Sequence, residues 1–342
     1  MRETVSTNKL TIRVYENAYV IRGEQVIFAY DENGRFIKNT SKRLVGEQKY
    51  LQVEDIDVNS IDNNTTEYEE LLYIGFLRGH WGHFLVDSTV RMWSISKNTK
   101  TCCKILANIE GMDHFYSWWF EQFGIDINSD IIDPQGILRV KRLLVPDISY
   151  LPGKYIFKEF IYPFDFIKDK IRNEEIECEK LYLSRVHIAK GKKQLGEIDI
   201  QHIFEKNGFK VVYPEELPAS EQIALYSKCK IMVTTSGTIA HNILFSNEGT
   251  ELIILDRYPN DNIHQHWLTT IRGAKEYHAK AFARNSSHAN NLMVVTRELM
   301  DICEQYGWIC KREGLAWRII KYILFYIPKA YKIYWRFKRA VD

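Results

Sequence analysis

The amino-acid sequence predicts an α/β protein of two domains, each built around a mainly parallel β-sheet. Its 342 residues are more than twice the roughly 150 residues of an ordinary domain. The composition, with 45% hydrophobic and 26% charged residues, is that of a globular protein and excludes disordered, collagen-like and coiled-coil chains. From residue 180 onward, short apolar runs alternate with segments of helical character, a pattern typical of βαβ units.

The first domain is predicted to span residues 1–168. Asn33-Gly34 indicates a turn after the first strands, because both residues tolerate a positive φ. The expected elements, in chain order, are strands at 10–14, 18–22, 25–30 and 71–76, a helix at 83–96, a strand at 104–107, a helix at 115–123 and a strand at 138–145.

A charge-dense stretch between Lys168 and Lys180 predicts the domain boundary, and the second domain is placed at residues 169–300. Its expected strands are 180–183, 210–213, 231–235 and 251–255, and its expected helices are 197–206, 219–227 and one that begins near Thr238. Residues 301–342 are predicted to form a C-terminal helical extension.

Charge and cysteine content indicate which partners and which cellular compartment to expect for this chain. Lysine and arginine number 46 against 44 acidic residues, and this near balance argues against a nucleic-acid partner. The six cysteines include no CxxC pair, which predicts a reduced, intracellular chain. The polar residues 1–10 offer no apolar signal core, and no run reaches the roughly 20 apolar residues of a spanning helix. We therefore expect a cytoplasmic protein.

The first candidate site is the segment 79–91, which follows a predicted strand. On a regular helix His83, Asp87 and Arg91 would share one face at i, i+4 and i+8, and His80 precedes them. An imidazole beside a carboxylate at the mouth of a βα turn can take a proton from a hydroxyl group. Two alternatives stay open: a metal site formed by His80, His83 and Asp87, and a helix cap with a solvated ion pair.

The second candidate site is the strand-to-helix turn Ser236-Gly237-Thr238, in the segment 234–242 that also contains Asn242. Free N–H groups and the positive dipole of a helix start suit a diphosphate, and Gly237 lets the backbone approach it. The turn is neither GxGxxG nor a P-loop, and Ser-Gly-Thr also serves as a simple N-cap.

The third candidate is Arg185, at the carboxyl end of the strand predicted at 180–183, where its guanidinium can fork onto phosphate oxygens. Lys190, Lys192 and Lys193 follow it and compete for the same role, although a lysine-rich loop is more often simply solvated.

The C-terminal region from residue 315 interleaves apolar and aromatic residues with basic ones, and its only acidic residue is Asp342. This pattern predicts an amphipathic helix, bent at Pro328, that contacts an anionic membrane surface. The alternatives are a helix that packs over the first domain with its lysines in water and, less favoured, RNA binding. The basic residues are Arg318, Lys321, Lys329, Lys332, Arg336, Lys338 and Arg339.

Taken together, these segments resemble glycosyltransferase family 61, which includes bacterial capsular polysaccharide enzymes. The resemblance covers about residues 70–256 and rests on Gly82 to Ser88, Tyr182 to Arg185, Glu197, Ser220 to Ile223 and the stretch from Ser236 to Phe245. Many relatives have His-Gly-Ala where this chain has Ser236-Gly237-Thr238. The resemblance implies a GT-B fold, in which two Rossmann-like domains face each other across a cleft. It also implies an inverting, metal-independent transfer of a sugar from a nucleotide-sugar donor.

The resemblance assigns roles to the candidate residues. Asp87 is the expected base, with His83 second, and His80 and Arg91 lie on the acceptor side. Neither a cofactor nor a metal is expected. The acceptor is expected to be a saccharide, lipid-linked and met at the cytoplasmic face of the membrane. Competing functions are transfer of a pyruvyl or phosphate group, and nucleotide-sugar binding without catalysis. The expected donor-binding residues are Arg185, Lys190, Ser236, Gly237, Thr238, Asn242 and, for the ribose, Glu251.

Overall fold

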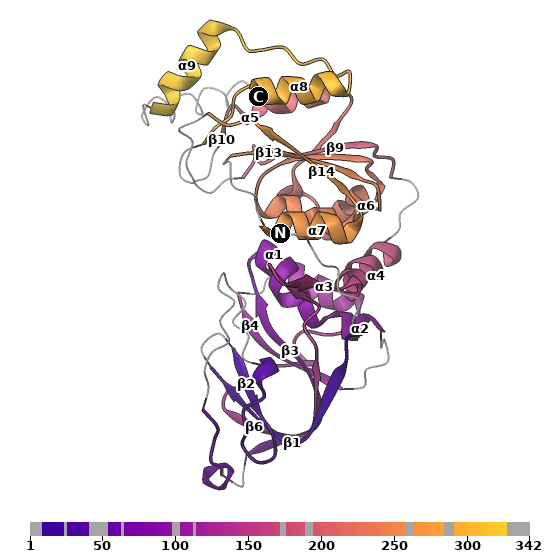
Figure 1. Ribbon diagram of the computed structural model, residues 1–342, viewed down its shortest axis with the longest axis vertical. Helices are drawn as coiled ribbons and strands as arrows, with labels where there is room; N and C mark the ends of the chain where they lie inside the picture. The colour runs from indigo at the N-terminus through magenta and orange to yellow at the C-terminus, as the bar shows by residue number, and fades with distance from the viewer. Residues whose placement is uncertain are drawn as a thin grey trace. The chain divides into compact units, whose positions relative to one another are not determined.

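The computed structural model divides into two compact units, Met1–Lys170 and Ile171–Asp342, so that the boundary follows residue 170 where the sequence analysis placed it after 168. Each unit has an α/β fold (Figure 1). The structure describes residues 9–23, 26–40, 54–62, 65–97, 103–111, 114–171, 176–188, 194–257, 263–283 and 291–326.

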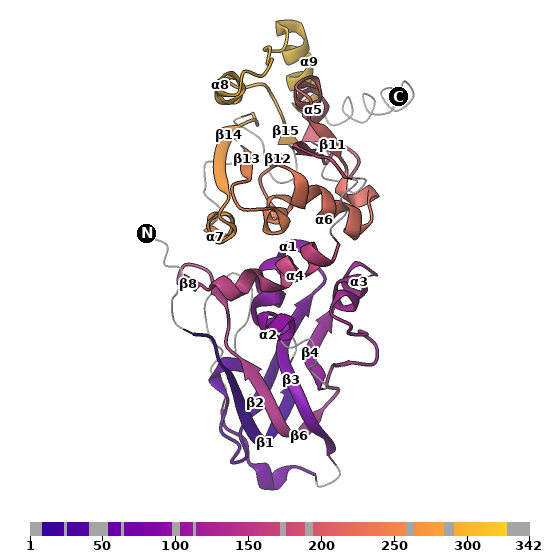
Figure 2. The same cartoon turned by 90° about the vertical axis from the view of Figure 1, so that its right-hand side faces the viewer.

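The first unit contains a six-stranded mixed sheet in the order β2-β1-β6-β3-β4-β5 (Figure 2). Strands β6, β3, β4 and β5 are parallel, and β1 is antiparallel to both of its neighbours. A single β1 replaces the two strands predicted at 10–14 and 18–22, because pairing with β6 resumes directly after the positive φ of Asn17. The strands are β1 (Ile12–Arg22), β2 (Ile27–Tyr30), β3 (Thr66–Arg78), β4 (Lys104–Glu110), β5 (Ile131–Ile132) and β6 (Ile137–Pro146).

The chain order of the parallel strands creates a topological switch point between β3 and β6. The chain moves from β3 outward through β4 and β5 and then returns to the other side of β3 with β6. In open α/β sheets ligands bind outside the carboxyl ends of the strands at such a point. The segment after Arg78, the last residue of β3, therefore lies where a ligand site is expected.

The helix predicted at 83–96 is replaced by four short pieces. They are α1 (Trp81–His83), a π-helical turn η3 (Phe84–Ser88), a 3₁₀ turn η4 (Thr89–Arg91) and α2 (Trp93–Lys97). Phe84 packs edge-on against Trp119, and Trp119 packs against Phe164, so an aromatic core supports this segment. The remaining helices that cover it are α3 (His114–Gln122), η5 (Lys158–Ile161) and α4 (Tyr162–Lys170).

The second unit contains a five-stranded parallel sheet in the order β11-β9-β12-β13-β14. This is the 2-1-3-4-5 order of a doubly wound fold, and its switch point lies between β9 and β12. The sequence prediction is confirmed residue for residue at 180–183, 231–235 and 197–206. The strands are β9 (Lys180–Leu183), β11 (Lys210–Val212), β12 (Ile231–Thr235), β13 (Glu251–Asp256) and β14 (Lys275–Lys280).

Helices cover both faces of this sheet (Figure 1). Helices α5 (Glu197–Lys206) and α8 (Arg297–Gln305) bury Phe204, Leu299 and Ile302 in the core over one face. The other face carries α6 (Ala219–Lys228), η7 (Thr238–Phe245) and α7 (Ile263–Arg272). The predicted end of the domain at residue 300 is wrong, because it falls inside α8, whose apolar face belongs to the core.

Helix α9 (Leu315–Tyr326) packs on the second unit, where it contacts β15 (Asn291–Leu292), the partner of β10 (Gln194–Leu195). The alternative of packing over the first domain with all its lysines in water is wrong for Lys321, whose side chain is fully buried. No helix in the described ranges is long and apolar enough to cross a membrane. Lys329 and the later basic residues lie outside the described residues.

Candidate active site

The switch point of the second unit brings together the ends of β9 and β12, which pair in parallel from Lys180 to Leu183. Ser184 follows β9 and is fully buried, and its hydroxyl bonds the Oε1 of Gln201 on α5 at 2.9 Å. The same hydroxyl accepts the N–H of Val186. Ser184 therefore ties the loop that carries Arg185 to α5 and also closes the turn around the arginine.

The backbone of Arg185 is fixed by a hydrogen bond, whereas its guanidinium is available to bind a ligand. Its N–H donates to Glu197 Oε1 at 2.8 Å, while the side chain is half-buried. Within the described ranges the guanidinium makes no hydrogen bond or ion pair. A fixed arginine with a free head group at this edge of the sheet is suited to bind an anion.

Glu197, the first residue of α5, lies behind this loop with no exposed surface. Burial raises the pKa of its carboxyl group to about 7, although the N–H of Arg185 and the positive charges of Arg185 and Arg257 act in the opposite direction. The charge of Glu197 thus changes near neutral pH next to the backbone of Arg185.

The turn after β12 is open and stereochemically special. Gly237 has φ 127° and ψ −165°, a conformation that favours glycine, and a Cβ at this position would meet no atom within 4 Å. Thr238 is exposed beside it, while Asn242 is buried farther along. The predicted helix is a 3₁₀ helix, η7, so it is wound more tightly than the α-helix that was expected, with about 3.0 residues per turn instead of about 3.6.

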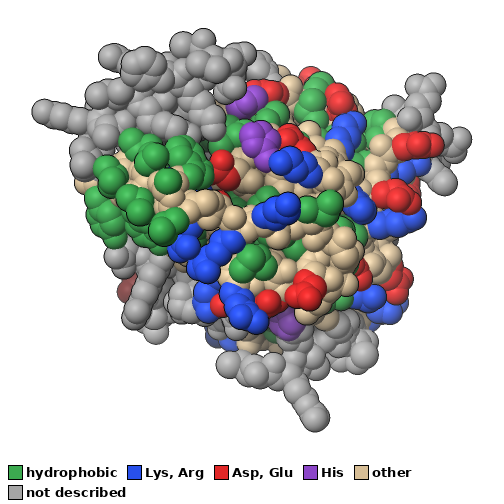
Figure 3. All heavy atoms as spheres, turned by 90° about the horizontal axis from the view of Figure 1, so that it is seen from above, with side chains coloured by type: hydrophobic (Ala, Val, Ile, Leu, Met, Phe, Trp, Pro, Cys, Tyr) green, Lys and Arg blue, Asp and Glu red, His purple; other side chains and the backbone are tan. Residues whose placement is uncertain are grey.

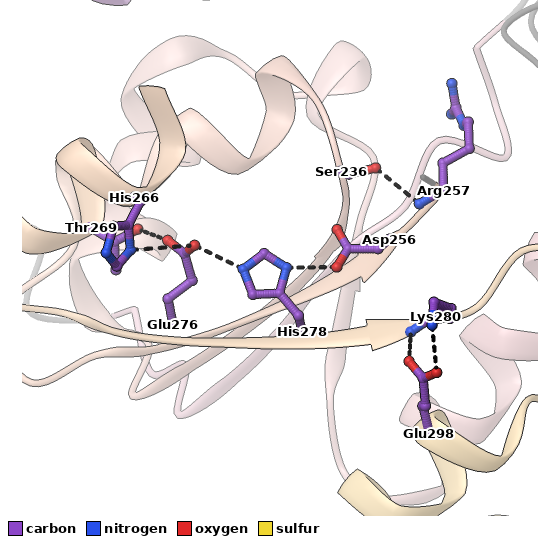
Figure 4. A network of polar contacts seen from close by, with 9 residues as sticks. All are labelled: Ser236, Asp256, Arg257, His266, Thr269, Glu276, His278, Lys280 and Glu298. Carbon is purple, nitrogen blue, oxygen red and sulfur yellow. Dashed lines mark hydrogen bonds and ion pairs between the residues drawn. The ribbon is translucent and has the colours of Figure 1, made fainter. Parts of the chain in front are cut away.

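Arg257 is a further cation at this edge that the sequence analysis missed. It follows β13, and its N–H donates to Ser236 Oγ at 3.3 Å (Figure 4). Its guanidinium lies 5.1 Å from the ring centre of Phe282. The signal was its position, because Arg257 follows the carboxyl end of β13 just as Arg185 follows that of β9.

One predicted donor residue, Glu251, is not brought to this edge. Glu251 begins β13 and pairs with Ile231, so it lies at the amino edge of the sheet, where it accepts a hydrogen bond from the hydroxyl of Tyr306 at 2.7 Å. The expectation that Glu251 contacts the donor ribose is therefore wrong, because the opposite ends of a parallel strand are separated by its length. Lys190 lies outside the described residues.

A polar network runs beside the site on the α7 side of the sheet (Figure 4). His278 on β14 bonds Asp256 Oδ2 through Nδ1 at 2.6 Å and Glu276 Oε1 through Nε2 at 2.8 Å. These two carboxylates raise the pKa of His278 to about 10, so the imidazole carries a positive charge at neutral pH. Since Asp256 precedes Arg257, the network fixes the end of β13.

In the first unit the structure joins His83 and Asp87. His83 Nδ1 and Asp87 Oδ2 are 2.9 Å apart, and the side chains are 38% and 8% exposed, respectively. Ser88 Oγ accepts the N–H of Arg78, which ties the π-helical turn to the end of β3. His80 is exposed, and its ring centre lies 5.1 Å from that of His83. The imidazole of His83 is therefore the more solvent-exposed group of the pair, and the carboxylate of Asp87 is the more buried one.

Arg91 does not lie on the same face. Its guanidinium is buried and donates to the carbonyl oxygens of Pro146 and Asn39, at 3.2 and 2.6 Å. The expectation of a shared helical face is wrong, because the π turn and the 3₁₀ turn that follows it break the spacing of 100° per residue. Arg91 instead joins the end of β6 to the segment after β2, away from the acceptor side where we expected it.

Nowhere in the described ranges do three His, Cys, Asp or Glu side chains converge in a way that could hold a metal ion. The alternative that His80, His83 and Asp87 are three metal ligands therefore finds no support among these residues.

Comparison with known proteins identifies one family. The family model for glycosyltransferase 61 matches residues 81–253, about half of the chain. No curated protein sequence matches the chain. Among solved structures, similarity is found to the dodecameric iron-containing heptosyltransferase TibC in complex with ADP-D-beta-D-heptose, at 9% sequence identity and a TM-score of 0.31. The match covers 84% of this chain and 85% of that one.

Proposed function

Because the chain belongs to glycosyltransferase family 61 and is a glycosyltransferase, we propose that it transfers a sugar, with inversion, from a nucleotide-sugar donor to a saccharide acceptor. The process we propose is capsular or surface polysaccharide synthesis, with a lipid-linked acceptor at the cytoplasmic face of the membrane. The architecture we propose is GT-B, the two-domain fold that the resemblance implies. The observation that supports the proposal best is the cationic, open edge formed by Arg185, Gly237 and Arg257.

The donor diphosphate would bind at this edge of the second unit. The guanidinium of Arg185 would bind its oxygens, and the open turn at Gly237 would let the backbone N–H groups approach them. Arg257, which is fixed to Ser236, would supply a second positive charge. As the bond to the sugar breaks, negative charge grows on the departing diphosphate, and fixed cations stabilise that charge without a metal ion.

The acceptor hydroxyl would be activated in the first unit. We expected Asp87 to be the base, but burial favours His83, with Asp87 as the residue that orients it. When Nδ1 of His83 donates to Asp87, Nε2 carries the lone pair that can take the proton of the hydroxyl. His80, exposed beside His83, would contact the acceptor.

Calorimetric titration with nucleoside diphosphates tests the donor site. Arg185→Ala should weaken binding by about 10- to 100-fold, because a hydrogen bond to a charged group contributes about 1.5–3 kcal/mol. Arg297→Ala is the matched control, since Arg297 is 88% exposed on α8. Unchanged affinity of Arg185→Ala would contradict this assignment.

Product analysis tests the reaction itself. Release of a free nucleoside diphosphate from a nucleotide sugar, together with inverted stereochemistry in the product, is the expected result, and EDTA should leave the rate unchanged. Binding of nucleotide sugars without turnover across donors would favour a non-catalytic role. Transfer of a pyruvyl or phosphate group instead of a sugar would refute the proposal.

A further inference from the structure

Helix α9 is attached to the second unit by one face only. The Nζ of Lys321 lies 3.1 Å from Asp199 Oδ2, 2.5 Å from Glu313 Oε1 and 3.0 Å from the carbonyl oxygen of Met293. Trp317 donates to the same Asp199 carboxylate at 3.1 Å. These contacts leave α9 little freedom to rotate about its axis.

Apolar packing completes the attachment. Leu324 and Phe325 pack against a small buried cluster formed by Leu195, Ala283 and Leu292. The side of α9 that faces the protein is therefore settled by both polar and apolar contacts, and the opposite side must face outward.

That opposite side is a continuous apolar stripe, the α9 stripe. Its members recur at helical spacing and range from 37% exposed at Tyr322 to 72% at Leu315. Five side chains line a shallow hollow in it, and one of them is the basic Arg318. Figure 3 shows hydrophobic side chains gathered on one part of the viewed face, with lysine and arginine beside them. The exposed members are Leu315, Ile319, Ile320, Tyr322, Ile323 and Tyr326.

Charge around the stripe has one sign. Helix α9 contains no acidic residue, and the carboxylates of Asp199 and Glu313 that contact it are both bound to Lys321. The sequence after α9, residues 327–342, contains five basic residues and one acidic residue, together with Tyr331, Tyr334, Trp335 and Phe337. The stripe is apolar and includes Arg318 in its hollow, and the sequence that follows α9 is rich in basic and aromatic residues. This composition is complementary to an anionic lipid surface.

We infer that the α9 stripe is a docking surface for an anionic lipid bilayer. The twelve residues of α9 are too few to span a membrane, which takes about 20 residues. The helix therefore lies on the bilayer, with Leu315, Ile319 and Ile323 in the interface and Lys321 holding the enzyme body on its other side. This inference does not depend on the proposed reaction, because it rests on contacts and exposure within the second unit alone.

Co-sedimentation of the full chain with lipid vesicles tests it. We expect binding to vesicles of phosphatidylcholine mixed with phosphatidylglycerol, weaker binding to phosphatidylcholine alone, and a further loss at high salt. The double variant Ile319→Glu/Ile323→Glu should reduce the vesicle-bound fraction by about tenfold or more, since it places charges where apolar groups meet lipid. Ile309→Glu is the control, because Ile309 is 65% exposed outside α9 and should bind like the wild type.

Three results would overturn the inference. The first is failure of the wild-type chain to bind the phosphatidylglycerol vesicles, and the second is equal binding by the double variant. The third is a dimer in sedimentation velocity, without vesicle binding, that the double variant abolishes, which would make a second copy of the chain the occupant of the stripe. Thermal unfolding of each variant is the control for folding, since a midpoint equal to that of the wild type shows that the variant is folded and that a loss of vesicle binding has another cause. Since no donor is needed, these results are independent of glycosyl transfer.

Discussion

Replacement of the buried Glu197 by glutamine should stabilise the protein at alkaline pH and leave it unchanged at acid pH. Burial raises the pKa of Glu197 from 4.5 to about 7, so the folded state binds this proton more tightly than the unfolded state does. The stability that the protonated carboxyl contributes is fully present below pH 4.5 and is lost as the pH rises to about 7.

The size of the effect follows from that shift. A difference of about 2.5 pH units at about 1.4 kcal/mol per unit amounts to about 3 kcal/mol. Glutamine is neutral at every pH, and its side-chain oxygen can still accept the N–H of Arg185. Glu197→Gln should therefore match the wild type near pH 4.5 and exceed its free energy of unfolding by about 3 kcal/mol at pH 8.

Urea unfolding at a series of pH values is the measurement. His278 also titrates differently in the two states, since its pKa is raised to about 10, so its contribution is lost as the pH rises from 6.5 toward 10. That contribution is common to both proteins and cancels in the difference between them. Glu304→Gln, an exposed position on α8, is the control and should show no such difference. A difference between Glu197→Gln and the wild type that does not change between pH 4.5 and 8 would refute the reasoning.

Two further predictions concern the first unit and the attachment of α9. His83→Ala should lower kcat by about 100-fold or more, as loss of a general base commonly does. Asp87→Asn should lower kcat less, because Asp87 only orients His83. Steady-state kinetics of the folded variants is the measurement, and a larger loss of kcat in Asp87→Asn than in His83→Ala would contradict this assignment. Gly196→Ala should lower the midpoint of thermal unfolding, because a Cβ there would lie 2.4 Å from the carbonyl oxygen of Met293 and 2.8 Å from Lys321 Nζ, at a φ of +85°. Gly208→Ala is the matched control, since Gly208 also has a positive φ but a Cβ there would meet no atom within 4 Å. Gly208→Ala should therefore lower the midpoint less.

The second unit could be predicted from sequence because its elements are local and regular. The strands at 180–183 and 231–235 are short apolar runs between polar turns, and the helix at 197–206 has an amphipathic period. The turn from Asp31 to Gly34 in the first unit could be predicted for the same reason, since Gly34 has φ 77° and the Asp31 carboxylate accepts the N–H of Asn33. In each case the residues that decide the structure are neighbours in the chain.

The residues after β3 could not be predicted in this way. A 3.6-residue period assumes a regular α-helix, but the segment from Phe84 to Arg91 forms a π turn and then a 3₁₀ turn. The cause is tertiary, because Phe84 is packed among Tyr116, Trp119 and Phe120, and Arg91 reaches carbonyl oxygens on β6 and after β2. The same limit applies to Lys321, whose partners Asp199 and Met293 are distant in sequence.

Buried polar groups that lack a hydrogen-bond partner among the described residues occur near both candidate sites and lower the stability of the fold. In the second unit the hydroxyl groups of Tyr182, Thr234 and Thr235, on the two strands that flank the switch point, are buried without a hydrogen-bond partner in the described part of the chain. In the first unit the same is true of one guanidinium nitrogen of Arg78, at the end of β3, and of the amide nitrogen of Asn108 on β4. Each such group costs about 1–3 kcal/mol, and the buried carboxyl of Glu197 adds to this cost at neutral pH. A fold selected for stability alone would place apolar side chains at these positions. Similar groups also occur away from both sites, such as the amide nitrogen of Asn39 and the side-chain oxygen of Asn291. The choice of the carboxyl edges therefore rests on the geometry of Arg185 and Gly237 in the second unit and of His83 and Asp87 in the first.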